Sequence, residues 1–335
     1  MTAVSVTGLG TYLPEQRMTA ADIATASGLP EWVVTDKLGI REKRLPGPDD
    51  HTNVMGLRAA EQALADAGIQ ADEIDVVISI NEEHKDYPVW TSGIKLAHDL
   101  GASRAWAYDI GQKCGTSVLA LKQARDLLVA DPRVDTVLIA GGYRNCDLID
   151  YQDPNVRFLY NLAAGGAAVV VQRTDSGHRI LDSAFRTDGA FSLDVIVPVG
   201  GTREPLRPDN VGEYRLTVPD PAGMKSRLDA KSMANFVGVV EDALERSGRA
   251  PADVDHVAML HMKRSAHDHV LDTLGIAQDR SIYLADYGHM GQVDQILSLQ
   301  LAASAGRLSP GSLAVLVAAG IGYVWNALCL EWGAR

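Results

Sequence analysis

The chain has 335 residues, of which 46% are hydrophobic and 22% are charged, so it can bury a large core in about two domains. Its net charge of −12 disfavours nucleic acid as a partner. The three cysteines (Cys114, Cys146 and Cys329) show no paired spacing and no C-x-x-C motif. This pattern argues against a disulfide framework or a zinc site and favours a reducing compartment.

The N-terminal residues predict no signal peptide, and the apolar runs predict no membrane segment. The first residues lack the charged and apolar regions of a signal peptide. The most apolar run, residues 313–319, is far shorter than a membrane span. We therefore expect a cytoplasmic protein without a membrane partner.

The first strongly patterned segment covers residues 61–80. Its periodicity predicts an amphipathic helix, a stop at Gly68, a short acidic turn and then a buried strand. The strand ends at a polar segment, residues 81–86, which contains Glu82.

The most informative stretch is Asp109-Ile-Gly-Gln-Lys-Cys114-Gly-Thr-Ser117. A short apolar segment precedes it at residues 106–108, and a helical pattern follows at residues 118–128. Cys114 is therefore expected at a tight strand-to-helix corner, where the helix N-terminus favours thiolate over thiol. Such a thiolate suits covalent acyl transfer. The alternative is a buried cysteine without a chemical role.

The second half of the chain repeats the first. Residues 241–260 match residues 61–80 at an offset of 180, and residues 312–320 match the apolar strand 134–142 at nearly the same offset. Chance similarity between helix–turn–strand segments is the alternative, but two ordered matches indicate a duplicated α/β unit.

We expect an N-terminal half at residues 1–174 and a C-terminal half at residues 175–335. Ligand sites in open α/β sheets lie beyond the carboxyl ends of the strands. A pseudo-dyad between the halves would bring two strand ends and two strand–helix corners together there. They supply a carboxylate, two imidazoles and a thiol, from Glu82, His261, His289 and Cys114.

Over essentially its whole length, the chain resembles the β-ketoacyl-ACP synthase III family of the thiolase superfamily. The segments that carry the resemblance lie in order at residues 6–14, 31–35, 39–42, 109–117, 137–142, 164–169, 224–225, 261, 288 and 320–327. The resemblance implies an α/β, thiolase-like, five-layered αβαβα fold with two pseudo-symmetric halves. It also implies a homodimer.

The resemblance implies roles for individual residues. Cys114 would take an acyl group from a CoA or acyl carrier protein (ACP) thioester. The backbone N–H groups of Cys114 and Gly322 would form the oxyanion hole, and His261 would be the catalytic histidine. Trp32 would stack on the CoA adenine, and Tyr87 would reach the partner's acyl pocket across the dimer interface.

Other cofactor contacts are less well defined. The family's arginine after the tryptophan is replaced by Asp36-Lys37, which leaves Arg157 and Arg264 as weaker candidates for CoA binding. We expect acyl-CoA or acyl-ACP as a substrate, with no permanently bound cofactor and no metal.

The second corner departs from the family, because Gly-Asn is replaced by Gly288-His289. An imidazole N–H can replace an amide N–H as a donor, so condensation remains feasible. Histidine can also act as a base toward a hydroxyl or amine. Asp294 could orient His289, giving the Cys-His-Asp arrangement with which some relatives form esters. The alternative for Asp294 is a solvated carboxylate at a helix start.

Two further features leave the reaction open. The family's His-Gln-Ala-Asn reads His-Met-Lys-Arg at residues 261–264, which weakens the case for ordinary malonyl-ACP chemistry and favours specialised metabolism. Glu82 precedes Cys114 at a spacing close to that of the catalytic glutamate in hydroxymethylglutaryl-CoA synthases, although residues 81–86 also read as a polar loop.

The expected function is thioester-dependent acyl transfer through Cys114. The acceptor is either a malonyl thioester, with decarboxylative condensation, or a hydroxyl or amine. An aldol-type condensation that uses Glu82 is the alternative. A non-catalytic partner subunit is a third alternative, but it would be expected to lose the nucleophile.

Overall fold

The computed structural model describes residues 3–334. Its strands are β1 (Ser5–Tyr12), β2 (Arg17–Thr19), β3 (Glu42–Arg44), β4 (Val76–Ser79), β5 (Trp106–Asp109), β6 (Thr136–Tyr143), β7 (Gly165–Gln172), β8 (His178–Thr187), β9 (Val254–Met259), β10 (Leu313–Gly320) and β11 (Val324–Glu331). Its α-helices are α1 (Ala20–Ser27), α2 (Thr52–Ala67), α3 (Ser92–Leu100), α4 (Thr116–Ala130), α5 (Pro221–Arg246), α6 (Arg264–Leu274) and α7 (Asp294–Ser304).

The strand order repeats between the two halves. The main sheet runs β5-β4-β6-β7-β1-β8-β11-β10-β9. In the first half β1 is antiparallel to β7, β7 is antiparallel to β6, and β6 is parallel to β4. In the second half β8, β11, β10 and β9 repeat these three relations in the same sequence. A short pairing of β1 with β8 joins the halves.

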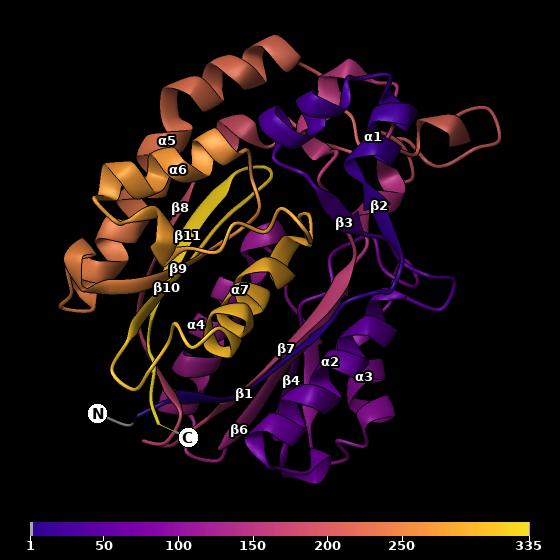
Figure 1. Ribbon diagram of the computed structural model, residues 1–335. Coiled ribbons are helices and arrows are strands. Elements are labelled where there is room, and N and C mark those ends of the chain that lie inside the picture. Colours follow the sequence, from indigo (N-terminus) through magenta and orange to yellow (C-terminus); the bar gives the residue numbers. More distant parts are fainter. Residues whose placement is uncertain (1–2, 335) are drawn as a thin grey trace.

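The elements form five layers, as expected for a thiolase fold (Figure 1). Helices α2 and α3 cover the outer face of the first half-sheet, and α5 and α6 cover the outer face of the second. Helices α4 and α7 lie side by side between the half-sheets, and each contacts strands of both halves. The expected fold class is therefore confirmed. The division at residue 174 stays a prediction, which the repeated topology supports.

The local expectations agree with the observed elements. The helix-stop-strand patterns become α2 and β4 in one half and α5 and β9 in the other. Gly68 ends α2 in the left-handed conformation, with φ of 69°. Helix α5 begins much earlier than the repeat indicates, because the Asp220 side chain accepts a hydrogen bond from the backbone N–H of Gly223 and Pro221 occupies the first turn.

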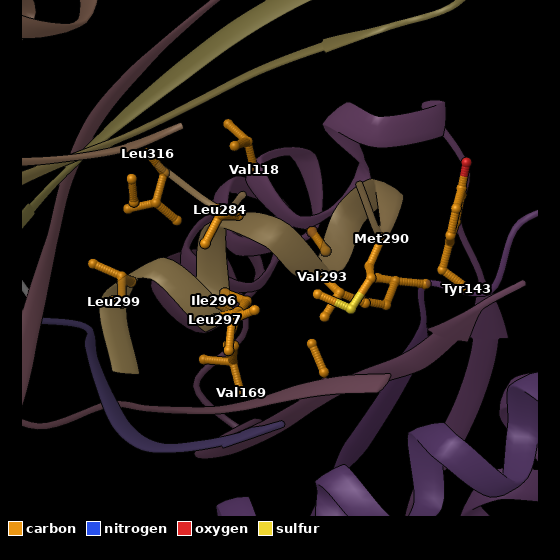
Figure 2. Packing of buried hydrophobic residues seen from close by; sticks show 14 of the residues in the cluster. Val118, Tyr143, Val169, Leu284, Met290, Val293, Ile296, Leu297, Leu299 and Leu316 are labelled. Carbon is orange, nitrogen blue, oxygen red and sulfur yellow. The ribbon is translucent and has the colours of Figure 1, made fainter. Parts of the chain in front are cut away.

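Apolar side chains from both half-sheets enclose the central helix layer. Leu316 of β10 and Val169 of β7 approach α7 from opposite sides, and Ile296 and Leu297 of α7 are buried between them (Figure 2). Gly165 contributes by lacking a side chain, because a Cβ there would lie 2.6 Å from the Met290 sulfur. This tight packing fixes the start of α7, and with it one of the two predicted corners.

No helix among residues 3–334 combines the length and the apolar character needed to cross a membrane.

Candidate active site

Cys114 lies at the corner that the sequence predicts. Strand β5 ends at Asp109, and a single helical turn, Lys113–Gly115, leads directly into α4. The second half holds this corner in place: Asn326 of β11 donates its side-chain N–H to Gln112 Oε1 (2.8 Å) and to the Gly115 carbonyl (2.9 Å). The thiol is therefore fixed against the opposite half-sheet.

His289 faces this thiol from the second corner. Its Nε2 is 3.1 Å from Cys114 Sγ, and its ring is buried. The backbone of His289 is held on both sides, since its N–H donates to the Asn161 carbonyl (2.7 Å) and its carbonyl accepts from Ala163 N–H (2.8 Å). The pseudo-dyad thus brings two residues 175 positions apart into direct contact.

Asp294 determines the tautomer of His289. Its Oδ2 lies 2.6 Å from His289 Nδ1 and accepts the backbone N–H of His261 at 2.8 Å, and its Oδ1 accepts the Met290 N–H at 2.7 Å. Because both carboxylate oxygens already face backbone N–H donors, Asp294 is placed to accept a further hydrogen bond from His289 Nδ1. His289 therefore carries its proton on Nδ1 and presents the Nε2 lone pair to the thiol. Asp294 is fully buried, so the solvated alternative is wrong.

Charge and burial act against each other at this pair. Burial raises the pKa of the Cys114 thiol, and the adjacent His289 opposes that rise. Burial alone would lower the pKa of His289, but the charges of Cys114 and Asp294 and their hydrogen bonds raise it well above its ordinary value. The pKa of the thiol is thus raised although Cys114 lies at the start of a helix, and His289 Nε2 is the group placed to accept its proton.

His261 lies beside Cys114, His289 and Asp294, but both of its ring nitrogens already have hydrogen-bond partners. Its Nε2 donates to the Gly39 carbonyl (3.1 Å), and its Nδ1 accepts from Asn161 Nδ2 (2.9 Å). Burial lowers its pKa to about 4, so the ring is neutral at physiological pH. In this orientation His261 has no free N–H to offer a thioester oxygen.

Glu82 is buried, although residues 81–86 form a loop whose other charged side chains are partly or fully exposed. Only 5% of the residue is exposed, and Asn145 donates to its Oε2 at 2.9 Å. Within the described residues, its Oε1 has no hydrogen-bond partner. Burial raises the pKa of Glu82, and the charges of Lys113 and His289 oppose this rise. The polar loop expected at residues 81–86 is therefore present, but Glu82 within it is buried, and its chemical role stays a prediction.

A cavity of about 780 Å³ opens onto these groups. Cys114, His261 and His289 line its floor, and apolar side chains of α5, including Met224 and Phe236, line one wall. Ile321 and Tyr323 also line the cavity. Between them, Gly322 adopts φ of 122°, a conformation that a residue with a side chain rarely adopts. The turn predicted to carry the second oxyanion donor thus borders the cavity that contains the thiol.

The predicted CoA and dimer residues lie away from this floor. Trp32 is 56% exposed and precedes the short helical segment Val33–Leu38, which packs on α6. Arg264 pairs with Asp268 and lies over the Tyr283 ring, and Arg157 is exposed. Tyr87 is 64% exposed, outside its own cavity. Their binding roles stay predictions.

Sequence reasoning missed two groups that complete the site. Asn161 binds both the ring and the carbonyl of His261, and Asn145 binds Glu82 beside the cavity. Neither residue belongs to a repeat or a periodic pattern, so a single sequence offers no signal for them. Among residues 3–334, no group of three or more His, Cys, Asp or Glu side chains forms a candidate metal site.

Comparison with known proteins decides the family. The model described as 3-oxoacyl-[acyl-carrier-protein] synthase III matches residues 108–189, and the model of that family's C-terminal region matches residues 244–332. The chain belongs to the 3-oxoacyl-ACP synthase III family. It is therefore an acyltransferase of the ketosynthase III type, which sets aside the non-catalytic alternative.

Relatives match this ketosynthase III chain from end to end. A β-ketoacyl-ACP synthase III of Symbiobacterium thermophilum is 29% identical over 334 residues, which cover 98% of each chain. The solved priming β-ketosynthase of the R1128 polyketide biosynthetic pathway has a TM-score of 0.88 and 25% identity, with 99% and 96% coverage. The acyltransferase ChlB3 shares the fold, with a TM-score of 0.82, 20% identity and coverage of 99% and 98%.

Proposed function

We propose that this ketosynthase III-type enzyme loads an acyl group onto Cys114 and transfers it to a hydroxyl or amine of a second substrate. The observation that carries this proposal is the continuous hydrogen-bonded series from Cys114 Sγ through His289 to Asp294. It has the arrangement of a nucleophile, a base and an orienting carboxylate. We infer a role in specialised metabolism, with acyl-CoA or acyl-ACP as the donor.

The residues present account for each proton in the two half-reactions. His289 Nε2 takes the Cys114 proton as sulfur attacks the donor thioester, and it returns that proton to the departing CoA or carrier thiol. The acceptor's O–H or N–H then loses its proton to His289 Nε2 as the heteroatom attacks acyl-Cys114. That proton passes to the Cys114 sulfur as the C–S bond breaks. The backbone N–H groups of Cys114 and Gly322 bind the oxyanion in both steps, each contributing about 3 kcal/mol.

The orientation of His261 favours this reaction over condensation with a malonyl thioester. Stabilising an enolate needs free N–H donors directed into the cavity. His261 Nε2 donates to the Gly39 carbonyl instead, and His289 Nδ1 donates to Asp294. His261 Nδ1 accepts from Asn161, which leaves His289 Nε2 facing the Cys114 thiol, and the raised pKa of His289 suits a base. ChlB3 bears the name of an acyltransferase, so the fold is compatible with that activity.

Aldol-type condensation is the second candidate, and Glu82 is the observation in its favour. Its Oε1 is buried without a partner, and its charge acts on both Cys114 and His289. A carboxylate with a raised pKa in such a place suits removal of a proton from an acetyl thioester. Exchange of acetyl protons in deuterated water by the acetylated enzyme, and its loss in Glu82→Gln, would favour this candidate.

Mass spectrometry of the intact protein tests the main proposal. The enzyme is incubated with a panel of acyl-CoA thioesters, and the acyl adduct is then exposed to an alcohol, an amine or a malonyl thioester. We expect an adduct on the wild-type protein, none on Cys114→Ala, and release as an ester or amide without carbon dioxide. Adduct formation by Cys114→Ala would overturn the acyl-enzyme, and release only by malonyl thioester with carbon dioxide would establish condensation.

A further inference from the structure

Lys43 of β3 is a fully buried lysine that the proposed reaction does not use. Among residues 3–334, no carboxylate lies within ion-pair distance of its ammonium group. Its Nζ donates instead to two backbone carbonyls, those of Tyr160 (2.8 Å) and Leu162 (2.7 Å). The Tyr151 ring lies on a further side, with its centroid 5.2 Å from Nζ.

Burial of a charge without a counter-ion is unfavourable. Burial lowers the pKa of Lys43 to about 8, which is the expected consequence. Methionine would fill nearly the same space without this penalty, but it would leave both carbonyls without a donor. The ammonium group therefore serves to donate hydrogen bonds to these two carbonyls.

The two carbonyls flank Asn161, which connects both histidines. The Asn161 carbonyl accepts the His289 N–H, and its side chain donates to the His261 ring and carbonyl. Leu162 pairs with His289 as an isolated parallel bridge. Residues 160–163 thus lie between Lys43 on one side and the two histidines on the other.

Strand β3 is also tied to the second corner directly. The Arg44 N–H donates to the Tyr287 carbonyl (3.2 Å), and the Ala164 N–H donates to the Arg44 carbonyl (3.0 Å). The backbone of β3 therefore bridges the segment before His289 and the segment after Asn161. Lys43 adds hydrogen bonds at the centre of this bridge.

We propose that Lys43 is a positioning residue that fixes residues 160–163. With this segment fixed, Asn161 keeps the His261 ring hydrogen-bonded to the Gly39 carbonyl and keeps His289 Nε2 in contact with the Cys114 thiol. The inference rests on the proposed function for its effect on turnover, but its effect on the Cys114–His289 pair is independent of the acceptor. Without the two carbonyl bonds, the segment can shift by a fraction of an ångström, and displacements of about 1 Å can lower a rate by about 100-fold.

The test compares Lys43→Met and Lys43→Arg with the wild-type enzyme. The first readout is the pH profile of Cys114 alkylation by iodoacetamide, which reports the ionisation of the thiol beside His289. For Lys43→Met we expect a profile shifted to higher pH and an acyl-transfer kcat lower by about 10- to 100-fold, with little change in KM. Lys43→Arg retains a cation with several donors, so it should restore part of both.

Proton NMR of the protein labelled with ¹⁵N-histidine gives a second readout. The N–H signals of His261 Nε2 and His289 Nδ1 should be sharp in the wild type, since both are hydrogen-bonded and buried. In Lys43→Met, both should broaden or move. Leu96→Ala is the stability control, because Leu96 is fully buried in a separate core cluster under α3. It should lower Tm without changing the alkylation profile.

The outcomes separate this inference from the proposed function. A folded Lys43→Met protein with wild-type alkylation, NMR signals and kcat would overturn the inference. If Lys43→Met does not fold, Asn161→Ala must reproduce the alkylation shift and Lys43→Arg must show an intermediate one, or the inference fails. Release of the acyl group by condensation alone would overturn the proposed function, while the alkylation profiles would still test Lys43.

Discussion

Asp294 fixes the proton on His289, because its carboxylate accepts hydrogen bonds from His289 Nδ1 and from two backbone N–H groups. An asparagine at this position has only one acceptor atom and adds donors that face other donors. We expect Asp294→Asn to lower the single-turnover rate of acyl transfer by about three to four orders of magnitude, by analogy with the orienting carboxylate of serine proteases. Rapid quench with acyl-CoA measures this rate.

Asp126→Asn is the matched control for that change. Asp126 is an exposed carboxylate of α4, the helix that begins beside Cys114, and it pairs with Lys122. Its substitution should leave the rate unchanged. An Asp294→Asn enzyme with the wild-type rate would show that His289 does not depend on this carboxylate.

Glu82 should make stability depend on pH in the direction opposite to most carboxylates. Burial raises its pKa above the ordinary value of 4.5, so the folded protein binds this proton more tightly than the unfolded chain. The contribution of Glu82 to stability is therefore complete below pH 4.5 and declines as pH rises through the folded-state pKa. We expect Glu82→Gln to unfold at a higher Tm than the wild type at neutral pH, and the two to converge in acid.

The neighbouring Glu83 provides the contrasting control. Partial burial would raise its pKa, but pairing with Lys113 lowers it overall. Glu83→Gln should consequently have a lower Tm than the wild type at neutral pH. In acid, where Glu83 is protonated, the two proteins should have the same Tm. Thermal unfolding followed by circular dichroism over this pH range measures both variants. If Glu82→Gln has the wild-type Tm at every pH, burial does not raise the pKa of Glu82.

The turn between β10 and β11 contains Gly322, the predicted second donor of the oxyanion hole. Gly322 adopts φ of 122°, and a Cβ there would lie 3.2 Å from the backbone of Ser192. Gly322→Ala should therefore twist the turn and move its N–H away from the cavity. We expect Cys114 acylation to slow by about 100- to 1,000-fold, the usual effect of losing one oxyanion donor. Stopped-flow measurement of thiol release from acyl-CoA gives this rate.

Gly212→Ala is the control that separates the effect of the turn geometry at Gly322 from a general effect of replacing a glycine by alanine. Gly212 has open space around it, so alanine there should have no effect on acylation. If Gly322→Ala is folded and acylates Cys114 at the wild-type rate, the second oxyanion donor must come from another group.

Elements with their own local pattern could be predicted from the sequence, and those that depend on distant contacts could not. The corner at Cys114 follows from a strand ending beside a helical pattern, and the duplication places His289 opposite it. The orientation of His261 depends on Gly39 and Asn161, which lie 222 and 100 positions away. The burial of Glu82 depends on Asn145 of another loop. Polar character alone predicts a loop around Glu82, and the strand pattern before His261 does not indicate the direction of its ring.

At the scale of the whole molecule, the edge of the nine-stranded sheet is exposed at β5. Trp106 of β5 is 52% exposed and stacks on Tyr108, and Ile94 of the adjacent α3 is 59% exposed. Tyr87 and Val89 add further exposed apolar surface on the preceding loop. An uncovered edge strand beside apolar side chains is suited to pairing with a second chain. This surface supports the predicted homodimer.

We expect the enzyme to sediment at twice its chain mass of 35.9 kDa, and the double variant Ile94→Glu/Trp106→Glu to sediment as a monomer. Two buried carboxylates facing their symmetry mates would oppose association. If Tyr87 closes the partner's acyl pocket, the monomer should lose selectivity among acyl chains while iodoacetamide still alkylates Cys114. Leu193→Glu, an exposed position in the other half, should remain dimeric. If the wild-type enzyme is a monomer in analytical ultracentrifugation, the exposed β5 edge is not a homodimer interface.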